Sequence, residues 1–420
     1  MFFEKGLYRP LPSRILFRSH LSLVRSFDVA VVGAGPAGST AARVVAEKGF
    51  KTLVFDRRST IGIPIQCGEL IPIPSEAANL FPRSKIMPNA VHVPKKFITN
   101  KTTSIRLVSP NGAAFEFPFE ANIVDRGAFD QYLAHRAEDA GAELLLSTKL
   151  VHRSNMNELF LKSRNSKSDA SAKVVIGADG AHSEVAQSLG NHYTHREHDL
   201  SPSLQFVMEN TDIDPSVVEM YFGGSIAPGG YSWIIPKGDG NVNVGFGMRR
   251  VLAKDETPLR TYLERFVYRN PHVAPMLKNA RILSRIGAII PVGGPLQRTW
   301  SSNVVLVGDA AGHVMASNGG GIPTALCGGT IAGDSVSDHI VAGTPLSQYE
   351  KTWKDEFGLE LDTALRVLRI ADMVMPSDSV TDICMRLAGV RFLEPLIRCR
   401  LPPLVDFASK TLVKVITQFM

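Results

Sequence analysis

One segment, FDVAVVGAGPAGSTAARVVAEKGFKTLVFDRR, constrains the fold more than any other part of the chain (residues 27–58). The apolar run DVAVV predicts a buried strand, and the following residues predict a helix from about Ala37 to Lys48. KTLVF then predicts a second strand that ends at Asp56. A β-α-β unit of this kind begins a parallel sheet covered by helices, so the expected fold class is α/β with a Rossmann-like domain.

Three glycines lie between the first strand and the helix, in the pattern G-x-G-x-x-G (Gly33, Gly35 and Gly38). Gly33 permits a tight turn, Gly35 lets the backbone approach a pyrophosphate, and Gly38 allows helix and strand to pack closely. The helix that starts at Ala37 presents free N–H groups to phosphates. Asp56 lies at the spacing from which a carboxylate accepts hydrogen bonds from a ribose. The unit therefore predicts a dinucleotide site, for NAD or for FAD.

Two later segments again place a glycine-containing turn after a strand. One is VVIGADGAHSEVAQSLG (residues 174–190), and the other is SSNVVLVGDAAGHVMASNGGGIPTAL (residues 301–326), in which a helix is expected to start near Ile322. They resemble the DG and GD motifs of FAD-dependent enzymes of the p-hydroxybenzoate hydroxylase type. The resemblance implies that the cofactor is FAD.

The same resemblance implies roles for five further residues. Asp309 would bind the ribityl chain of the flavin. Gly321 and Ile322 would bring backbone N–H groups and a helix N-terminus to the pyrimidine edge of the flavin, where negative charge develops on reduction. Arg126 would lie against the cofactor, and Leu150 would end a strand whose backbone contacts the adenine.

Residues 27–345 as a whole resemble the geranylgeranyl reductases, and among them most closely the archaeal digeranylgeranylglycerophospholipid reductases. Three stretches carry this resemblance: GIPIQCGEL (residues 62–70), GGYSWIIPKG (residues 229–238) and GDAAGHVMASNGGGI. The family implies that reduced FAD hydrogenates isolated C=C bonds of polyprenyl chains, here on an archaeal ether phospholipid precursor.

The family match places the segment from Cys67 through Gly68 to Leu70 at the cofactor. Gly68 would let this segment lie against the flavin ring without a side-chain clash. Cys67 is small enough to approach the ring or the alkene. The sequence leaves open whether Cys67 donates a proton or is a small buried thiol that shapes the pocket.

Tyr231 and Trp233 alternate with Ser232 and Ile234, which predicts a strand with both aromatic rings on one face. They would line a tunnel for the apolar chain or form the core of a sheet. Pro236 is expected to end this strand. Lys237 is expected to be solvated or to meet a phosphate.

The chain is expected to form two interleaved domains. The FAD-binding domain would comprise residues 27–62, 122–192 and 284–345. The substrate domain, largely an antiparallel β-sheet, would comprise residues 63–121 and 193–283.

Both ends of the chain are basic. Residues 1–26 contain five Lys and Arg residues against Glu4, a net charge of +4, and we expect a disordered extension, a targeting segment or a membrane-surface arm. Residues 346–420 are expected to form a helical region with an amphipathic end. From Arg386 onward six basic residues face two acidic ones, so this end would lie on an anionic membrane or pack on the protein's own core.

Composition limits the remaining partners. Four cysteines without a C-x-x-C pair predict an intracellular protein with no disulfide framework and no metal site. No apolar run reaches eighteen residues, so we expect no transmembrane helix and place the protein in the cytoplasm, peripherally on the membrane. The basic residues form no stripe typical of nucleic-acid binding. No second Rossmann fingerprint occurs, so the electron donor would be a transiently bound NAD(P)H or ferredoxin.

Two alternatives remain at this stage. A flavin-dependent aromatic monooxygenase or halogenase would share the cofactor motifs, and YSWIIP is close to the W-x-W-x-I-P of the halogenases. A non-catalytic flavin-binding or lipid-binding protein would also share them.

Overall fold

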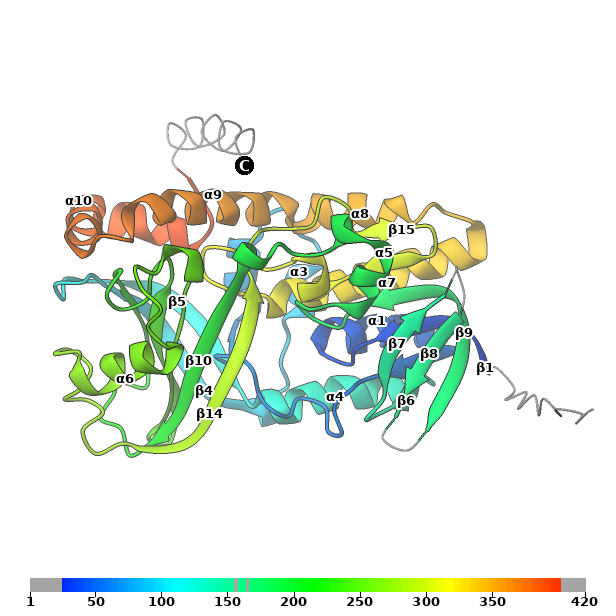
Figure 1. Ribbon diagram of the computed structural model, residues 1–420, viewed down its shortest axis with the longest axis horizontal. Helices are drawn as coiled ribbons and strands as arrows, with labels where there is room; N and C mark the ends of the chain where they lie inside the picture. Colours follow the sequence, from blue (N-terminus) through cyan, green and yellow to red (C-terminus); the bar gives the residue numbers. More distant parts are fainter. Residues whose placement is uncertain (1–24, 155–157, 164–165, 402–420) are drawn as a thin grey trace, which may run out of the picture.

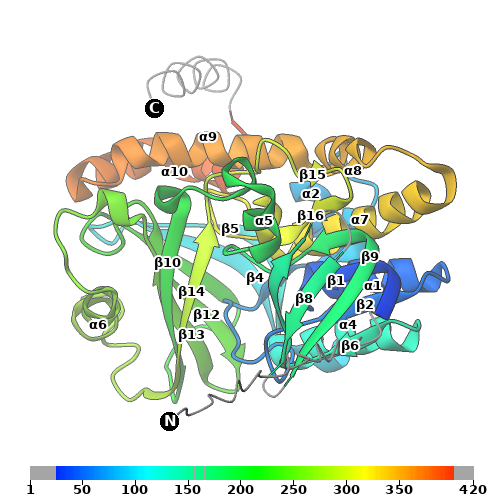
Figure 2. The ribbon, with the colours of Figure 1, turned by 45° about the vertical axis from the view of Figure 1, so that its right-hand side comes forward.

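The computed structural model describes residues 25–154, 158–163 and 166–401. Two eight-stranded sheets lie side by side, and a layer of C-terminal helices lies above them (Figures 1 and 2). The basic residues before 25 and the amphipathic end after 401 lie outside the described residues.

The first sheet is largely parallel and has the strand order β15-β16-β9-β1-β2-β6. Strands β6, β2, β1, β9 and β16 run parallel to one another. An antiparallel ribbon, β7 with β8, extends the sheet from β9. The strands are β1 (Arg25–Val32), β2 (Thr52–Phe55), β6 (Glu143–Leu145), β7 (Lys149–Arg153), β8 (Glu158–Lys162), β9 (Lys167–Gly177), β15 (Trp300–Ser301) and β16 (Val304–Leu306).

Helices α1 (Pro36–Glu47), α4 (Arg126–Asp139) and α7 (Ile322–Ala342) cover the first sheet. Helices α1 and α7 can approach closely because α7 has glycines at the contact. A Cβ on Gly329 would lie 2.5 Å from the Ala37 carbonyl oxygen, and one on Gly333 would lie 2.6 Å from the Val44 Cβ. This packing brings the N-termini of both helices to one edge of the sheet.

The second sheet is mainly antiparallel and has the order β14-β10-β13-β12-β11-β4-β5-β3, in which only the pairing of β4 with β11 is parallel among the described strands. Helix α6 (Leu259–Arg269) packs its apolar side on the outer face. The strands are β3 (Leu70–Pro72), β4 (Ile98–Val108), β5 (Ala114–Val124), β10 (Leu200–Glu209), β11 (Val217–Phe222), β12 (Tyr231–Gly238), β13 (Asn241–Gly247) and β14 (Arg281–Pro291).

After α7, the described chain from 347 to 397 is helical. Helix α8 (Ser347–Trp353) continues through a π-helical turn into α9 (Leu359–Val374), and α10 (Asp378–Ile397) folds back with a kink at Gly389, where φ is 56°. Among the described helices none combines the length and apolarity needed to span a bilayer. The short helices are α2 (Pro74–Leu80), α3 (Met87–Ala90) and α5 (Glu184–Leu189).

The sequence predicted the mixed α/β class and the first β-α-β unit correctly, with α1 running from Pro36 to Glu47. Two local expectations were wrong. Pro236 does not end its strand, because β12 continues to Gly238 through a register shift. The boundary expected at residue 284 falls inside β14, which pairs with β10 of the second sheet along its length.

Candidate functional site

A cavity of about 740 Å³ lies between the two sheets. All but one of the site residues proposed from the sequence line it. These are Gly33, Gly35, Ala37, Asp56, Cys67, Gly68, Leu70, Arg126, Leu150, Tyr231, Trp233, Asp309, Gly321 and Ile322. The exception is Gly38, which lies behind the cavity wall.

The glycine turn, residues 33–38, forms one side of the cavity. Gly33 has a φ of +98°, and a Cβ there would lie 2.4 Å from the Ala178 carbonyl oxygen. A Cβ on Gly38 would lie 1.9 Å from the Gly33 carbonyl oxygen. By contrast, a Cβ on Gly35 would meet no atom within 4 Å, so this backbone faces open space. Helix α1 starts there without a side-chain cap, and its first N–H groups are the kind that bind phosphates.

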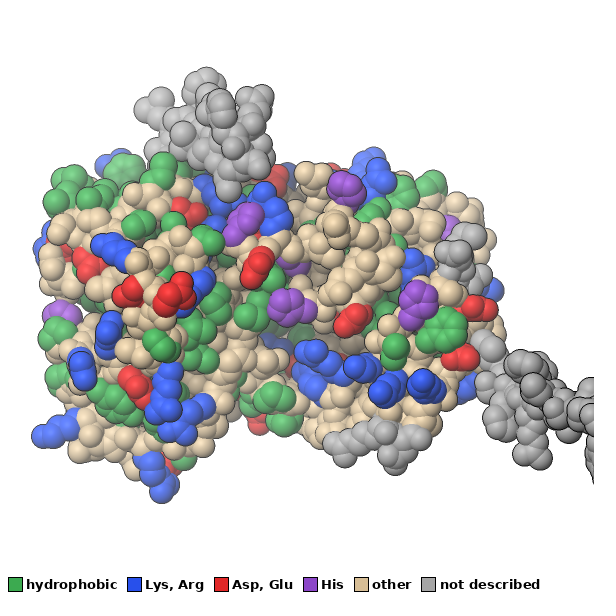
Figure 3. All heavy atoms as spheres, in the orientation of Figure 1, with side chains coloured by type: hydrophobic (Ala, Val, Ile, Leu, Met, Phe, Trp, Pro, Cys, Tyr) green, Lys and Arg blue, Asp and Glu red, His purple; other side chains and the backbone are tan. Residues whose placement is uncertain are grey.

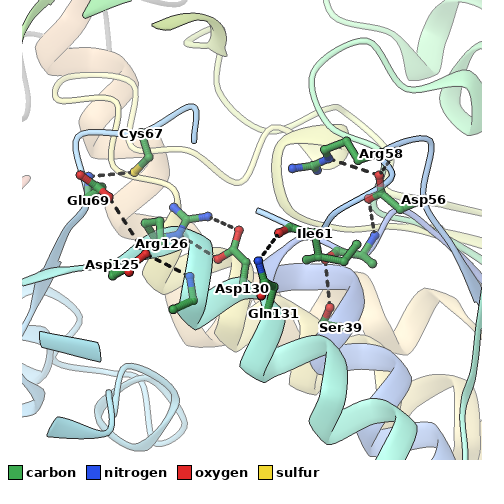
Figure 4. A network of polar contacts seen from close by, with 12 residues as sticks. Ser39, Asp56, Arg58, Ile61, Cys67, Glu69, Asp125, Arg126, Asp130 and Gln131 are labelled. Carbon is green, nitrogen blue, oxygen red and sulfur yellow. Dashed lines mark hydrogen bonds and ion pairs between the residues drawn. The ribbon is translucent and has the colours of Figure 1, made fainter. Parts of the chain in front are cut away.

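Asp56 is buried at the end of β2 and holds the glycine turn in place (Figure 4). Its Oδ2 accepts a hydrogen bond from the Ala34 N–H at 2.9 Å. Its Oδ1 accepts from the Arg58 N–H at 2.8 Å and pairs with the Arg58 guanidinium at 3.2 Å. The carboxylate is therefore oriented before any ligand arrives, at the cavity edge.

Asp309 lies in the short turn before α7, and its carboxyl group borders the cavity without a hydrogen-bond partner among the described residues. Burial raises its pKa to about 6, and the charge of Arg126 opposes that rise. Arg126 is itself held by Asp130, which accepts two hydrogen bonds from the guanidinium at 2.9 and 2.8 Å (Figure 4). Arg126 is thus a fixed cation in the wall of the cavity whose charge favours the ionised form of Asp309.

The cysteine loop, residues 62–70, contributes Gly62, Ile65 and the run from Gln66 to Leu70 to the lining of the same cavity. The Cys67 Sγ accepts a hydrogen bond from the Glu69 N–H at 3.1 Å (Figure 4). Burial raises the pKa of the Cys67 thiol, although the charge of Arg126 works in the opposite direction. The thiol is therefore neutral at neutral pH.

Glu69 anchors the cysteine loop to the second sheet. Its φ is 68° and its side chain is only 1% exposed. Its Oε2 pairs with the Lys237 ammonium and accepts a hydrogen bond from the Asn243 amide at 2.7 Å. The same amide donates to the Gly68 carbonyl oxygen at 3.2 Å. The sequence had led us to expect that Lys237 is solvated or meets a phosphate. This expectation was wrong, because the ammonium group is paired with Glu69.

A second contact holds the loop through Trp233. The Trp233 indole N–H donates to Gln205 Oε1 at 2.9 Å, and the Gln205 amide donates to the Cys67 carbonyl oxygen at 3.0 Å. Sequence reasoning missed Glu69, Gln205 and Asn243 as site residues. Only Glu69 had a visible signal, its place in the cysteine loop, because the partners come from distant strands.

Tyr231 lies beside Trp233, with ring centroids 5.8 Å apart in an edge-to-face arrangement. Its hydroxyl donates to the Asn318 carbonyl oxygen, and burial raises the pKa of the Tyr231 phenol. Both aromatic rings line the cavity and also pack against the main core. The expected sheet-core position is thus observed for both rings, and their role toward an apolar chain stays a prediction.

Beyond the cysteine loop the cavity wall becomes apolar. The side chains there come from the second sheet and from two helices, α2 and α10. They are Pro72, Leu80, Ile105, Phe119, Val218, Met220, Ile235 and Ile397. A long hydrocarbon chain fits a wall of this chemistry.

One proposed site residue has a different setting from the one expected. Leu150 was expected to end a strand, but it is the second residue of β7 (Lys149–Arg153). It is buried and borders the cavity near Asp56 and Thr148. Within the described ranges, no group of three or more His, Cys, Asp or Glu side chains could hold a metal ion.

Two family models match the chain. The geranylgeranyl reductase catalytic domain matches residues 199–290, and an NAD(P)-binding Rossmann-like domain matches residues 31–79. The digeranylgeranylglycerophospholipid reductase of Methanosarcina acetivorans is 32% identical over 85% of this chain and 89% of its own length. The reductase of the same name from Methanothrix thermoacetophila is 34% identical over 80% and 84%.

The chain is also similar in structure to solved proteins. A geranylgeranyl bacteriochlorophyll reductase-like protein of Thermoplasma acidophilum has 27% identity and a TM-score of 0.79, covering 92% of this chain and 99% of that protein. A flavin-dependent brominase has a TM-score of 0.68 and 15% identity over 94% of this chain and 100% of its own. At that identity the brominase shows a shared fold alone.

Proposed function

The chain belongs to the geranylgeranyl reductase family, and from that premise we propose that it is an FAD-dependent reductase that hydrogenates C=C bonds of geranylgeranyl chains on archaeal ether phospholipid precursors. One observation supports this more than any other. A single cavity joins a dinucleotide cradle to an apolar wall, and the cysteine loop lies between them. An enzyme that brings a flavin to a prenyl chain needs this order of parts.

The residues present fit FAD. The glycine turn leaves room for a pyrophosphate at Gly35, and the fixed carboxylate of Asp56 suits a ribose. Asp309 borders the cavity, and its carboxyl group has no hydrogen-bond partner within the described part of the chain, which suits the hydroxyls of a ribityl chain. The uncapped N-terminus of α7 at Gly321 and Ile322 suits the pyrimidine edge of a flavin.

Bound and reduced, FAD would supply the hydride for an isolated alkene. The chain's own residues would do the rest. The apolar wall excludes water and holds the prenyl chain, and Tyr231 and Trp233 restrict its position. Cys67 lines the cavity and its raised pKa favours the protonated thiol, so in this proposal Cys67 would protonate the second alkene carbon and regain a proton from solvent.

The partners follow from this reaction. The substrate is a polyprenyl phospholipid, and the protein would meet it at the cytoplasmic face of a membrane. The reducing equivalents would come from NAD(P)H or from a ferredoxin.

An anaerobic assay tests the proposal. Chemically reduced holoenzyme is mixed with an unsaturated archaeal lipid, and the lipid mass is followed. We expect gains in steps of two hydrogens, and a Cys67→Ser variant should slow them at least about tenfold while retaining flavin. No mass gain, together with substrate-dependent oxygen uptake on an aromatic compound in air, would instead indicate a monooxygenase or halogenase.

A further inference from the structure

Helix α10 carries an exposed apolar row that the proposed reaction does not use. Val380 is 45% exposed, Ile383 57% and Leu387 81%, and Cys384 between them is also exposed. Their spacing of three and four residues places them on one helical face. The opposite face is buried, and it comprises Thr381, Asp382 and Met385. Figure 3 shows hydrophobic side chains gathered at this end of the molecule, over α10.

The apolar side chains of α10 face outward before the kink at Gly389 and toward the core after it. After Gly389, the side chains of Val390, Leu393 and Ile397 pack against the core, and Ile397 lines the cavity. One helix thus presents apolar groups outward in its first half and forms part of the cavity wall in its second half. A lipid tail moving between the outer row and the cavity would contact the same helix throughout.

The charges around the row suit an anionic surface. Arg386 and Arg391 are exposed on α10, and Arg386 pairs with Asp382 at 2.7 Å while half of its side chain remains exposed. The helix also carries Asp378 and Glu394, but both are engaged by the protein itself, Asp378 by the Ser225 N–H and Glu394 by Arg398. The sequence that continues beyond the described residues, 402–420, adds Lys410 and Lys414 to an apolar helical pattern. Apolar side chains beside basic ones are the composition of a surface that lies in the headgroup layer of an anionic bilayer.

We propose that the α10 face, defined by Val380, Ile383, Cys384 and Leu387, is the surface with which this protein rests on an anionic lipid bilayer. This rests on the proposed function, since a lipid substrate gives the enzyme a reason to meet a membrane beside its cavity. The row inserts between headgroups, and the neighbouring arginines bind lipid phosphates.

Cosedimentation of the full-length holoenzyme with vesicles of equal parts phosphatidylcholine and phosphatidylglycerol tests the surface. The double variant Ile383→Asp/Leu387→Asp should partition onto vesicles at least about tenfold less than the wild type. Val341→Asp is the matched control, because Val341 is 77% exposed on α7, and it should bind as the wild type does. Thermal unfolding checks the fold, and Leu387→Ser serves as a milder second variant.

The outcomes separate the surface from the reaction. Reduction of detergent-dispersed lipid should be the same in the double variant and the wild type, whereas reduction of lipid in vesicles should fall with binding. Wild-type protein that does not sediment with vesicles, or a double variant that sediments equally well, overturns the surface. A wild-type dimer that the double variant converts to a monomer also overturns it and assigns the face to a second copy of the chain. Vesicle binding without any lipid reduction leaves the surface standing and refutes the reductase.

Discussion

The glycine turn and the cysteine loop face each other across one cavity, yet opposite physical conditions hold them in place. The glycine turn depends on missing atoms, because a Cβ on Gly33 or Gly38 would collide with backbone within 2.4 Å. The cysteine loop depends on added groups, because the side chains of Lys237, Asn243 and Gln205 reach it from the second sheet. Substitutions that enlarge a residue should therefore damage the turn, and those that remove a polar group should damage the loop.

The largest effect is expected at the turn. Gly38→Ala would place a Cβ 1.9 Å from the Gly33 carbonyl oxygen, so α1 and the turn must separate. We expect the free energy of unfolding to fall by about 4 kcal/mol and flavin content to be lost. Urea denaturation of the apoprotein measures the first quantity, and flavin absorbance of the purified protein measures the second.

Gly35→Ala is the matched control, because its Cβ meets open space and its φ of −76° suits any residue. The apoprotein should lose no more than about 1 kcal/mol, whereas flavin affinity should fall. Equal destabilisation by both variants would contradict the claim that close packing, and not the ligand, requires Gly38.

The next largest effect is expected at the loop. Glu69→Gln keeps the shape of the side chain but leaves the Lys237 ammonium, 17% exposed, without its counterion. Since an uncompensated buried charge is costly, we expect a loss of about 3 kcal/mol in the free energy of unfolding. The rate of alkene reduction should fall more than flavin affinity, because Cys67 moves with the loop.

Two further variants test whether the effect of Glu69→Gln is specific to the cysteine loop and whether it comes from the charge of Lys237. Glu219→Gln breaks the pair with Arg106, which joins neighbouring strands of the same sheet and does not border the cavity, so it should leave the reduction rate unchanged. Adding Lys237→Met to Glu69→Gln removes the stranded charge and should recover at least half of the lost stability. No recovery would show that the hydrogen bonds, and not the charge, stabilise the loop.

The same contrast explains what the sequence could predict. The glycine turn depends on local backbone conformation, so Gly33, Gly35 and Gly38 were recognisable within a few residues of one another. The groups that hold the cysteine loop are more than 130 residues from it in the chain, and Gln205 and Asn243 have no pattern around them. Lys237 was misjudged for this reason, since a lysine after a strand usually meets solvent.

Ionisation of the Asp309 carboxyl group should have a smaller, pH-dependent effect on the free energy of unfolding. The folded pKa of Asp309, about 6, lies above the ordinary value of 3.8, so folding favours the protonated form. The stability that the protonated Asp309 carboxyl group gives the folded state is fully present below pH 3.8 and is lost as the pH rises through 6. Asp309→Asn should therefore stabilise the apoprotein at pH 7 by about 2 kcal/mol, allowing for screening within the cavity, and weaken flavin binding. Urea titrations at several pH values measure this, and an advantage that persists at pH 3.5 would contradict it.

The smallest effect is expected at Trp233, which is linked to the loop by a hydrogen bond through Gln205. Trp233→Phe keeps an aromatic ring at the cavity wall but removes the N–H that donates to Gln205 Oε1 at 2.9 Å. Losing one hydrogen bond of this kind costs about 1 kcal/mol. The Gln205 amide would then be free to rotate away from the Cys67 carbonyl oxygen, so the Cys67 thiol should react faster with iodoacetamide.

The alkylation rate is measured on a Cys384→Ser background, because Cys384 is an exposed thiol. Tyr231→Phe is the control, since the Tyr231 hydroxyl donates to Asn318 and does not contact the loop. If Trp233→Phe leaves the alkylation rate unchanged while Glu69→Gln raises it, Glu69 alone positions the loop.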